Sequence, residues 1–148
     1  MYCDGGCRGN QVDTNVGGWG AWLSWGEHTL ELHGGERDTT NNKMELTACI
    51  QGLRAIKRKD VPVDVYLDSA YVLNGITDWI EGWQRNGWRN SKKEPVANKD
   101  LWLQLIAERD SFSDIHFNKV KGHADSAGNI RADALANLAM DEIEGERR

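Results

Sequence analysis

The stretch Val61-Pro62-Val63-Asp64-Val65-Tyr66-Leu67-Asp68-Ser69-Ala70-Tyr71 decides the fold class of this chain. Hydrophobic residues alternate along residues 61–67, which predicts a β-strand, and residues 69–80 predict a helix directly after it. A strand that runs into a helix is the repeating unit of α/β folds. Asp68 follows the strand, where such folds place functional groups, although an acidic residue there is also a common helix N-cap.

The residues before this unit predict strands and loops. A short strand is expected to end near Asp4, and residues 5–18, with five glycines, predict an irregular loop. Residues 19–25 and 29–33 alternate as two antiparallel strands joined by a turn at Gly26-Glu27.

The remaining segments predict helices and one more strand. Residues 41–59 carry hydrophobic side chains at helical spacing, with Thr40 or Asn41 as N-cap, and residues 82–95 are a basic, tryptophan-rich excursion. The elements expected after it are a helix over 100–109, a strand over 115–120, a loop over 121–129 and a final helix from about Ile130. The order βββαβααβα predicts a single α/β domain over residues 1–148.

Length and composition narrow the function classes. A chain of 148 residues is long enough to bury a hydrophobic core. Its net charge of −5 argues against non-specific binding of nucleic acid over its whole surface. Three cysteines (Cys3, Cys7 and Cys49) lack zinc spacing and favour reduced thiols. Without a signal peptide, a long hydrophobic run or a lipidation pattern, we expect a cytoplasmic protein that does not contact membranes.

Four acidic residues form the candidate site. Asp4 lies at the end of the first predicted strand, and Glu45 lies in the first turns of the predicted helix over residues 41–59. Asp68 follows the strand over residues 61–67, and Asp133 lies near the start of the last helix. Each has an ordinary structural explanation on its own, as a turn or cap residue. If the fold brings them together, their mutual repulsion must be offset, and hard divalent cations are the usual means.

Their order and surroundings resemble ribonuclease HI of the type 1 ribonuclease H family, in its bacterial form with a basic protrusion. The segments that carry the resemblance are Asp4-Gly5-Gly6-Cys7-Arg8-Gly9-Asn10, Thr39-Thr40-Asn41-Asn42-Lys43-Met44-Glu45-Leu46, Asp68-Ser69-Ala70-Tyr71, and Val120-Lys121-Gly122-His123-Ala124 followed by Asp133. The resemblance implies a mixed five-stranded sheet, three antiparallel strands and then two parallel ones, with helices on both faces.

The resemblance also implies an activity, namely endonucleolytic hydrolysis of the RNA strand of RNA/DNA hybrids by two Mg²⁺ ions, with Mn²⁺ as a substitute. Products would carry 5′-phosphate and 3′-hydroxyl ends, and the protein would act as a monomer on primers and stray hybrids during replication. The four carboxylates would be catalytic metal ligands, and His123, in a glycine-flanked loop, would assist proton transfer or product release.

Substrate contacts are implied in two regions. Basic and aromatic side chains alternate in the tryptophan-rich stretch, as expected for a surface that binds phosphates and sugars. The residues implied to contact the hybrid are Asn10, Thr40, Asn41, Trp79, Trp83, Arg85, Trp88, Arg89 and Asn98. The chain departs from the family at Asp38, where an arginine of the phosphate pocket is usual, although Arg37 is adjacent. Its first strand is also short.

Three alternatives remain beside this interpretation. A junction nuclease of the same fold is disfavoured by the Lys-Gly-His-Ala segment and the basic stretch. A non-catalytic hybrid-binding module would be expected to have lost at least one carboxylate, and all four are present. A structural α/β protein with coincidental acidic residues would bind Mg²⁺ only weakly.

Overall fold

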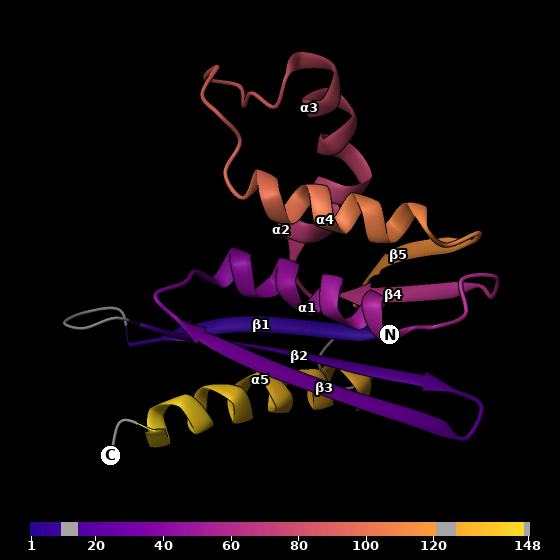
Figure 1. The fold of residues 1–148 in the computed structure, drawn as a ribbon, viewed down its shortest axis with the longest axis vertical. Coiled ribbons are helices and arrows are strands. Elements are labelled where there is room, and N and C mark those ends of the chain that lie inside the picture. Colours follow the sequence, from indigo (N-terminus) through magenta and orange to yellow (C-terminus); the bar gives the residue numbers. More distant parts are fainter. Residues whose placement is uncertain (10–14, 121–126, 147–148) are drawn as a thin grey trace.

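The computed structural model of the protein describes residues 1–9, 15–120 and 127–146. Its centre is a five-stranded sheet in the order β3-β2-β1-β4-β5 (Figure 1). The strands are β1 (Tyr2–Arg8), β2 (Val16–Trp25), β3 (His28–Arg37), β4 (Val63–Leu67) and β5 (Ile115–Lys119). The first three pair antiparallel, whereas β4 runs parallel to both β1 and β5, which confirms the predicted mixed sheet.

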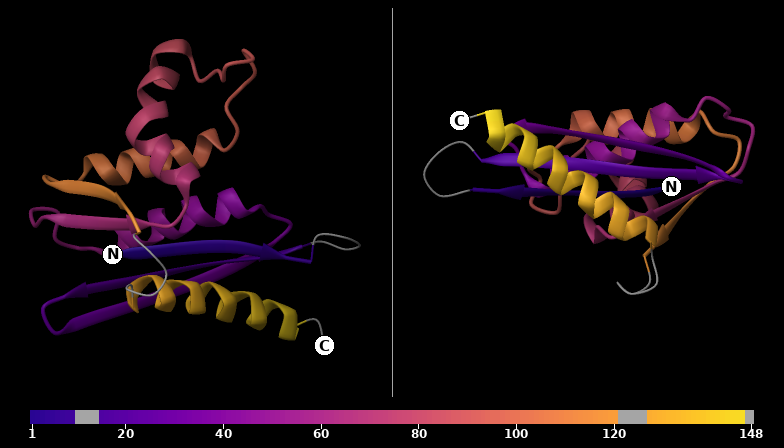
Figure 2. Two further views of the ribbon diagram at one scale, coloured as in Figure 1. Left: turned by 180° about the vertical axis from the view of Figure 1, so that it is seen from behind. Right: turned by 90° about the horizontal axis from the view of Figure 1, so that it is seen from below.

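Helices cover both faces of this sheet. They are α1 (Asn41–Ala55), α2 (Ala70–Asn74), the π-helical turn η1 (Gly75–Trp79), α3 (Ile80–Asn86), α4 (Lys99–Asp110) and α5 (Ala127–Glu146). A side chain at Gly17 would meet Met44 of α1, and one at Gly18 would meet Ala136 of α5. Because neighbouring residues of a strand face opposite ways, α1 and α5 lie on opposite faces. Figure 2 shows α5, in yellow, crossing the strands on its own face of the sheet.

Strand β1 corrects the predicted loop over residues 5–18. It continues through the glycines, because every residue from Tyr2 to Arg8 pairs with β2, ending at Arg8 opposite Val16. The strand β2 likewise starts at Val16 rather than Trp19. Long-range pairing outweighs the weak strand propensity of glycine here. The turn at Gly26-Glu27 is confirmed.

Helix α1 begins as predicted and ends earlier. The Thr40 hydroxyl accepts a hydrogen bond from the Lys43 N–H at 3.1 Å, which confirms it as N-cap. The helix ends at Ala55 rather than residue 59, because Ile56 is extended. Lys59 still stabilises the helix end, since its ammonium group donates to the Leu53 carbonyl at 3.3 Å.

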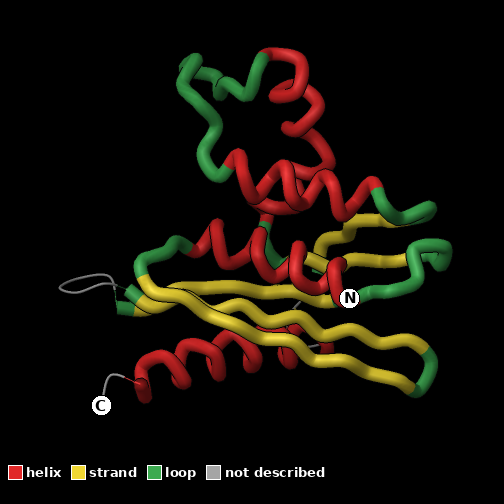
Figure 3. The backbone as a smooth tube through the Cα atoms, viewed as in Figure 1, coloured by secondary structure: helices red, strands yellow, loops and turns green. Residues whose placement is uncertain are grey.

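The helix predicted over residues 69–80 continues as α2, η1 and α3 and leads into a projecting loop (Figure 3). The π-helical turn starts at Gly75, where a side chain would lie 2.0 Å from the fully buried Trp102. The helix ends at Gly87, whose φ of 77° suits glycine. We call α3 and the loop over residues 87–98 the handle.

The main core lies between the sheet and helices α1, α2 and α4. Its largest fully buried side chains include Trp102, Leu46 and Leu67. On the other face, α5 starts at Ala127, three residues earlier than predicted, so residues 127–129 of the loop predicted over 121–129 are helical. Residues 121–126 of that loop lie outside the described residues. None of the helices in the described ranges has both the length and the hydrophobicity needed to cross a membrane.

Close contact between α5 and β2 depends on glycine. A Cβ atom on Gly20 would lie 2.4 Å from the Ala132 carbonyl oxygen and 2.6 Å from the Leu135 Cβ. Both neighbours are fixed by the helix, so neither can give way as a flexible side chain would. Gly20 also pairs with Asp4, which places this contact beside the candidate site.

We expect Gly20→Ala to destabilise the fold by about 1–3 kcal/mol, the usual cost of overpacking. Urea denaturation followed by circular dichroism measures this. Gly6→Ala is the matched control, because the space around a Cβ at Gly6 in the same sheet is open. Equal stability of the two variants would contradict the predicted contact.

Candidate active site

Asp4 and Asp68 lie on neighbouring strands where β1 and β4 stop pairing. The last paired residues are Cys3 and Leu67, so the acidic residue after each lies at the same end of the parallel pair. This is the edge at which α/β sheets bind ligands. Lys119 of β5 fixes the backbone there, because its Nζ donates to the Asp68 carbonyl at 2.6 Å and lies 4.0 Å from the Asp68 Oδ1.

Glu45 reaches Asp4 because Gly5 lets α1 approach the backbone of β1. A Cβ on Gly5 would lie 2.5 Å from the Met44 carbonyl carbon and 2.6 Å from the Glu45 nitrogen. The Gly5 N–H donates to Asp4 Oδ1 at 2.9 Å and to Glu45 Oε1 at 2.7 Å. A single backbone amide therefore joins the two carboxyl groups.

Burial and mutual repulsion raise the pKa of both groups. Desolvation raises the pKa of Asp4 to about 6, and Asp133 adds to the increase. Desolvation, then the charge of Asp4, raises the pKa of Glu45 to about 10. Their mutual hydrogen bond lowers the pKa of Asp4 and raises that of Glu45, so Glu45 carries the proton and donates it to Asp4. Near neutral pH the pair therefore carries one negative charge.

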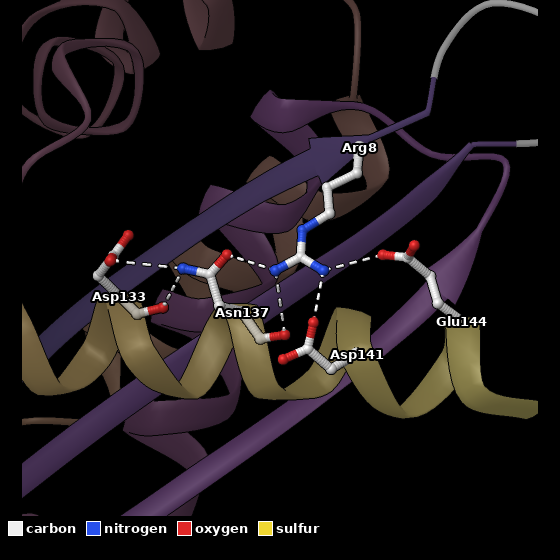
Figure 4. A network of polar contacts seen from close by, with 5 residues as sticks. All are labelled: Arg8, Asp133, Asn137, Asp141 and Glu144. Carbon is white, nitrogen blue, oxygen red and sulfur yellow. Dashed lines mark hydrogen bonds and ion pairs between the residues drawn. The ribbon is translucent and has the colours of Figure 1, made fainter.

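Asp133 completes this group from the opposite face of the sheet. It lies two turns into α5, and its hydrogen bond and charge both raise the pKa of Asp4. Asn137, one turn later, donates from Nδ2 to the Asp133 carbonyl at 3.0 Å and to Oδ2 at 3.4 Å (Figure 4). Carboxyl groups from β1, α1 and α5 thus meet, with Asp68 at the adjacent strand end.

The chemistry of this group fits a hard divalent cation after one proton is lost. Within residues 1–9, 15–120 and 127–146, no three His, Cys, Asp or Glu side chains are arranged to hold one metal ion. Asp4 and Glu45 instead share a proton, which offsets part of their repulsion. Because metal binding displaces protons from ligands, a cation would take over that role. A donor set of carboxylate oxygens alone suits Mg²⁺.

The residues predicted to contact the substrate, and the predicted catalytic His123, are only partly described. His123 and Asn10 lie outside the described residues. Thr40 and Asn41 are exposed at the start of α1 and line a pocket of about 280 Å³ together with Cys7, Arg8, Gly9, Asn15 and Thr39. A larger pocket of about 430 Å³, near Met1 and Trp25, contains none of the predicted site residues, so the carboxylates rather than pocket size locate the site.

Tryptophans of the handle serve largely as packing. The Trp83 ring centroid lies 5.8 Å from that of Trp88 and 5.5 Å from that of buried Trp102. Trp79 is 39% exposed and has more free surface. The Arg85 and Arg89 side chains are both exposed, and Arg85 forms an ion pair with Glu81 of the same helix.

Asn98 is tied to the aromatic cluster beneath the handle. It has a positive φ of 62° and precedes α4. Its Nδ2 donates to the Tyr71 hydroxyl at 3.2 Å, and Trp102 Nε1 donates to the same oxygen at 3.1 Å. The half-buried Asn98 side chain is therefore held in place before any ligand arrives.

Comparison with known proteins identifies the family. A family model described as RNase H matches residues 1–141. The chain belongs to the RNase H family. It is 48% identical over 143 residues to the ribonuclease H of Ruthia magnifica subsp. Calyptogena magnifica, covering 97% of this chain and 95% of that protein. It is 51% identical over 144 residues to the ribonuclease H of Halorhodospira halophila, covering 96% and 92%.

Solved structures of RNase H proteins share the fold. LC9-RNase H1, a type 1 RNase H with the type 2 active-site motif, is similar with a TM-score of 0.77 and 27% identity, covering 95% of this chain and 71% of that one. RNase H1 of the archaeon Halobacterium salinarum has a TM-score of 0.59 and 29% identity, covering 95% and 96%. The resemblance predicted from sequence is thereby confirmed, and the chain is an enzyme of the nuclease and hydrolase class.

Sequence reasoning did not single out three residues that surround the RNase H carboxylates. Lys119 contacts Asp68, and Arg8 and Asn137 form a network that reaches Asp133. Only Asn137 had a usable signal, since it follows Asp133 by four residues and must share its helix face. Lys119 and Arg8 meet their partners solely through the tertiary fold.

The raised pKa of Glu45 predicts a pH-dependent effect of Glu45→Gln on the metal-free protein. The pKa of Glu45 in the folded protein is above the ordinary value of 4.5, so Glu45 ionises more readily in the unfolded chain. The free energy of unfolding therefore falls as pH rises above that ordinary value. The variant should therefore melt at a higher temperature than the wild type near pH 8 in EDTA, and the gain should vanish near pH 4. Glu27→Gln, in the exposed β2–β3 turn, should show no such trend.

Proposed function

We propose that this RNase H family member hydrolyses the RNA strand of RNA/DNA hybrids endonucleolytically and leaves 5′-phosphate and 3′-hydroxyl ends. The observation that carries the proposal is the meeting of Asp4, Glu45 and Asp133 from three elements, with a hydrogen bond between Glu45 and Asp4. The relatives named ribonuclease H support the same activity. The enzyme acts as a single cytoplasmic domain over residues 1–148, as a monomer, on hybrids that arise during replication.

Asp4, Glu45, Asp68 and Asp133 would hold two Mg²⁺ ions, for which Mn²⁺ can substitute. Bound metal supplies an activated water and stabilises charge on the leaving oxygen. Asp4, ionised near neutral pH, and Asp68 at the adjacent strand end would be the central ligands. Glu45 would have to lose its proton to bind a cation, and His123 would assist proton transfer or product release.

The hybrid lies across the carboxylates between the pocket at α1 and the handle. Asn10, Thr40 and Asn41 contact the minor groove and 2′-hydroxyls, which distinguish RNA from DNA. Asn98, held by Tyr71, contacts a DNA phosphate. Trp79 supplies an exposed aromatic face, Trp83 and Trp88 support the handle, and Arg85 and Arg89 supply positive charge.

Asp68→Asn tests the catalytic role of the carboxylates. It should reduce Mg²⁺-dependent cleavage of the hybrid by more than roughly 10- to 100-fold, the loss typical when a residue that only hydrogen-bonds a metal ligand is removed. Hybrid binding and thermal stability should be nearly unchanged. The assay uses end-labelled RNA/DNA hybrid, double-stranded RNA, single-stranded RNA and duplex DNA, each with Mg²⁺ or EDTA.

The wild-type enzyme should cut only the hybrid, and only with Mg²⁺. Hybrid binding without cleavage by the wild type would indicate a binding module, and cleavage of duplex DNA would indicate a junction nuclease. If Asp68→Asn loses hybrid binding and stability together, the residue is structural.

Arg85→Ala combined with Arg89→Ala tests the handle. Hybrid binding should weaken, and the slope of log affinity against log salt should fall by about 1–2, since each lost phosphate contact lowers it by about 1. Fluorescence anisotropy at several salt concentrations measures both. Lys57→Ala with Arg58→Ala removes the same charge from exposed positions after α1 and should leave the slope unchanged. An unchanged slope in the handle variant would remove the handle from the interface.

A further inference from the structure

Arg8 links strand β1 to helix α5 through its side chain (Figure 4). Its Nη1 donates to Asp141 Oδ1 at 2.6 Å and to Glu144 Oε1 at 2.8 Å. Its Nη2 donates to Asn137 Oδ1 at 2.7 Å and lies 3.4 Å from the Asn137 carbonyl oxygen. Both ends of the planar guanidinium are therefore anchored on three successive turns of α5.

Asn137 extends this contact to Asp133. A side-chain amide has an accepting oxygen and a donating nitrogen. Because Arg8 occupies the oxygen, the nitrogen faces Asp133, where it donates to the carbonyl at 3.0 Å and to Oδ2 at 3.4 Å. The reversed amide would set its nitrogen against the guanidinium and its oxygen against the carboxylate, two repulsive contacts. Arg8 thus decides which end of Asn137 meets Asp133.

We propose that Arg8 and Asn137 are positioning residues that orient the Asp133 carboxylate as a metal ligand. This inference rests on the proposed function, in which Asp133 binds metal. Arg8 also follows Asp4 by four residues in the same strand, so the network ties the element carrying one ligand to the element carrying another. Hydrogen bonds of this kind fix the orientation of ligating carboxylates and strengthen metal binding.

Asn137→Leu tests the proposal, because leucine has a similar volume and neither donates nor accepts. The affinity of the metal-free protein for Mn²⁺, measured by calorimetry without nucleic acid, should fall about tenfold. The Mg²⁺ concentration for half-maximal hybrid cleavage should rise in parallel. Since Arg8 also lines the pocket beside Thr40, the substrate-free titration excludes any direct contribution of Arg8 to hybrid binding.

His33→Gln controls for general loosening of α5. His33 Nε2 contacts Glu142 Oε1 at 2.7 Å, which is another side-chain link between the sheet and the C-terminal half of α5. This variant should keep the Mn²⁺ affinity of the wild type. An equal loss of affinity in His33→Gln and Asn137→Leu would overturn the proposal.

Arg8→Lys provides a second, independent variant should Asn137→Leu fold poorly. Lysine keeps the charge but cannot contact Asn137, Asp141 and Glu144 together as the guanidinium does. The Mn²⁺ affinity should therefore fall, but by less than the tenfold expected for Asn137→Leu. Combined with Asn137→Leu it should add no further loss, because both residues act through one contact. Wild-type affinity in Arg8→Lys, or additive losses in the pair, would overturn the proposal.

Asp133→Asn separates this inference from the proposed function. If it lowers Mn²⁺ affinity while Asn137→Leu does not, the positioning role fails and the metal site stands. If Asp133→Asn leaves Mn²⁺ affinity unchanged, the proposed ligand itself is wrong, and the positioning role is overturned with it.

Discussion

The close approach of two helices to the sheet backbone at glycine is the constraint on which the rest of the site depends. Gly5 admits α1 from one face, and Gly20 admits α5 from the other, each at a distance that a Cβ atom would prevent. Asp4 adjoins Gly5 in β1 and pairs with Gly20 of β2. The two helices therefore bring their carboxylates to the same strand residue from opposite sides. A side chain at either glycine would separate Asp4 from Glu45 or from Asp133.

This convergence stores electrostatic repulsion in the folded protein. Desolvation and neighbouring carboxylates raise the pKa of Asp4 and Glu45, so a proton shared between them takes part of the role that we assign to a divalent cation. A site that concentrates like charges lowers the stability of the folded protein, and binding of a ligand of opposite charge restores it. The ion pairs of Arg8 and Arg131 secure α5 on both sides of Asp133, where this repulsion acts.

Tryptophans in and beneath the handle support it from below. Trp102 fills the space that Gly75 leaves at the π-helical turn, and Trp83 rests on it, so the projecting helix has its own small aromatic base. Arg85, which pairs with Glu81, and Arg89 are thus both exposed on a well-supported element. Local charge rather than net charge can then steer a polyanion toward the carboxylates.

Features that depend on neighbouring residues could be predicted from the sequence. Alternation in residues 61–67 predicted β4, Thr40 was one of the two predicted N-caps, and the motifs around the four acidic residues predicted the family. The continuation of β1 through its glycines to Arg8, and the contact of Arg8 with Asn137, 129 residues away, could not be predicted in this way. Strand pairing and ion pairing join distant segments, so local periodicity and propensity carry no record of the partner.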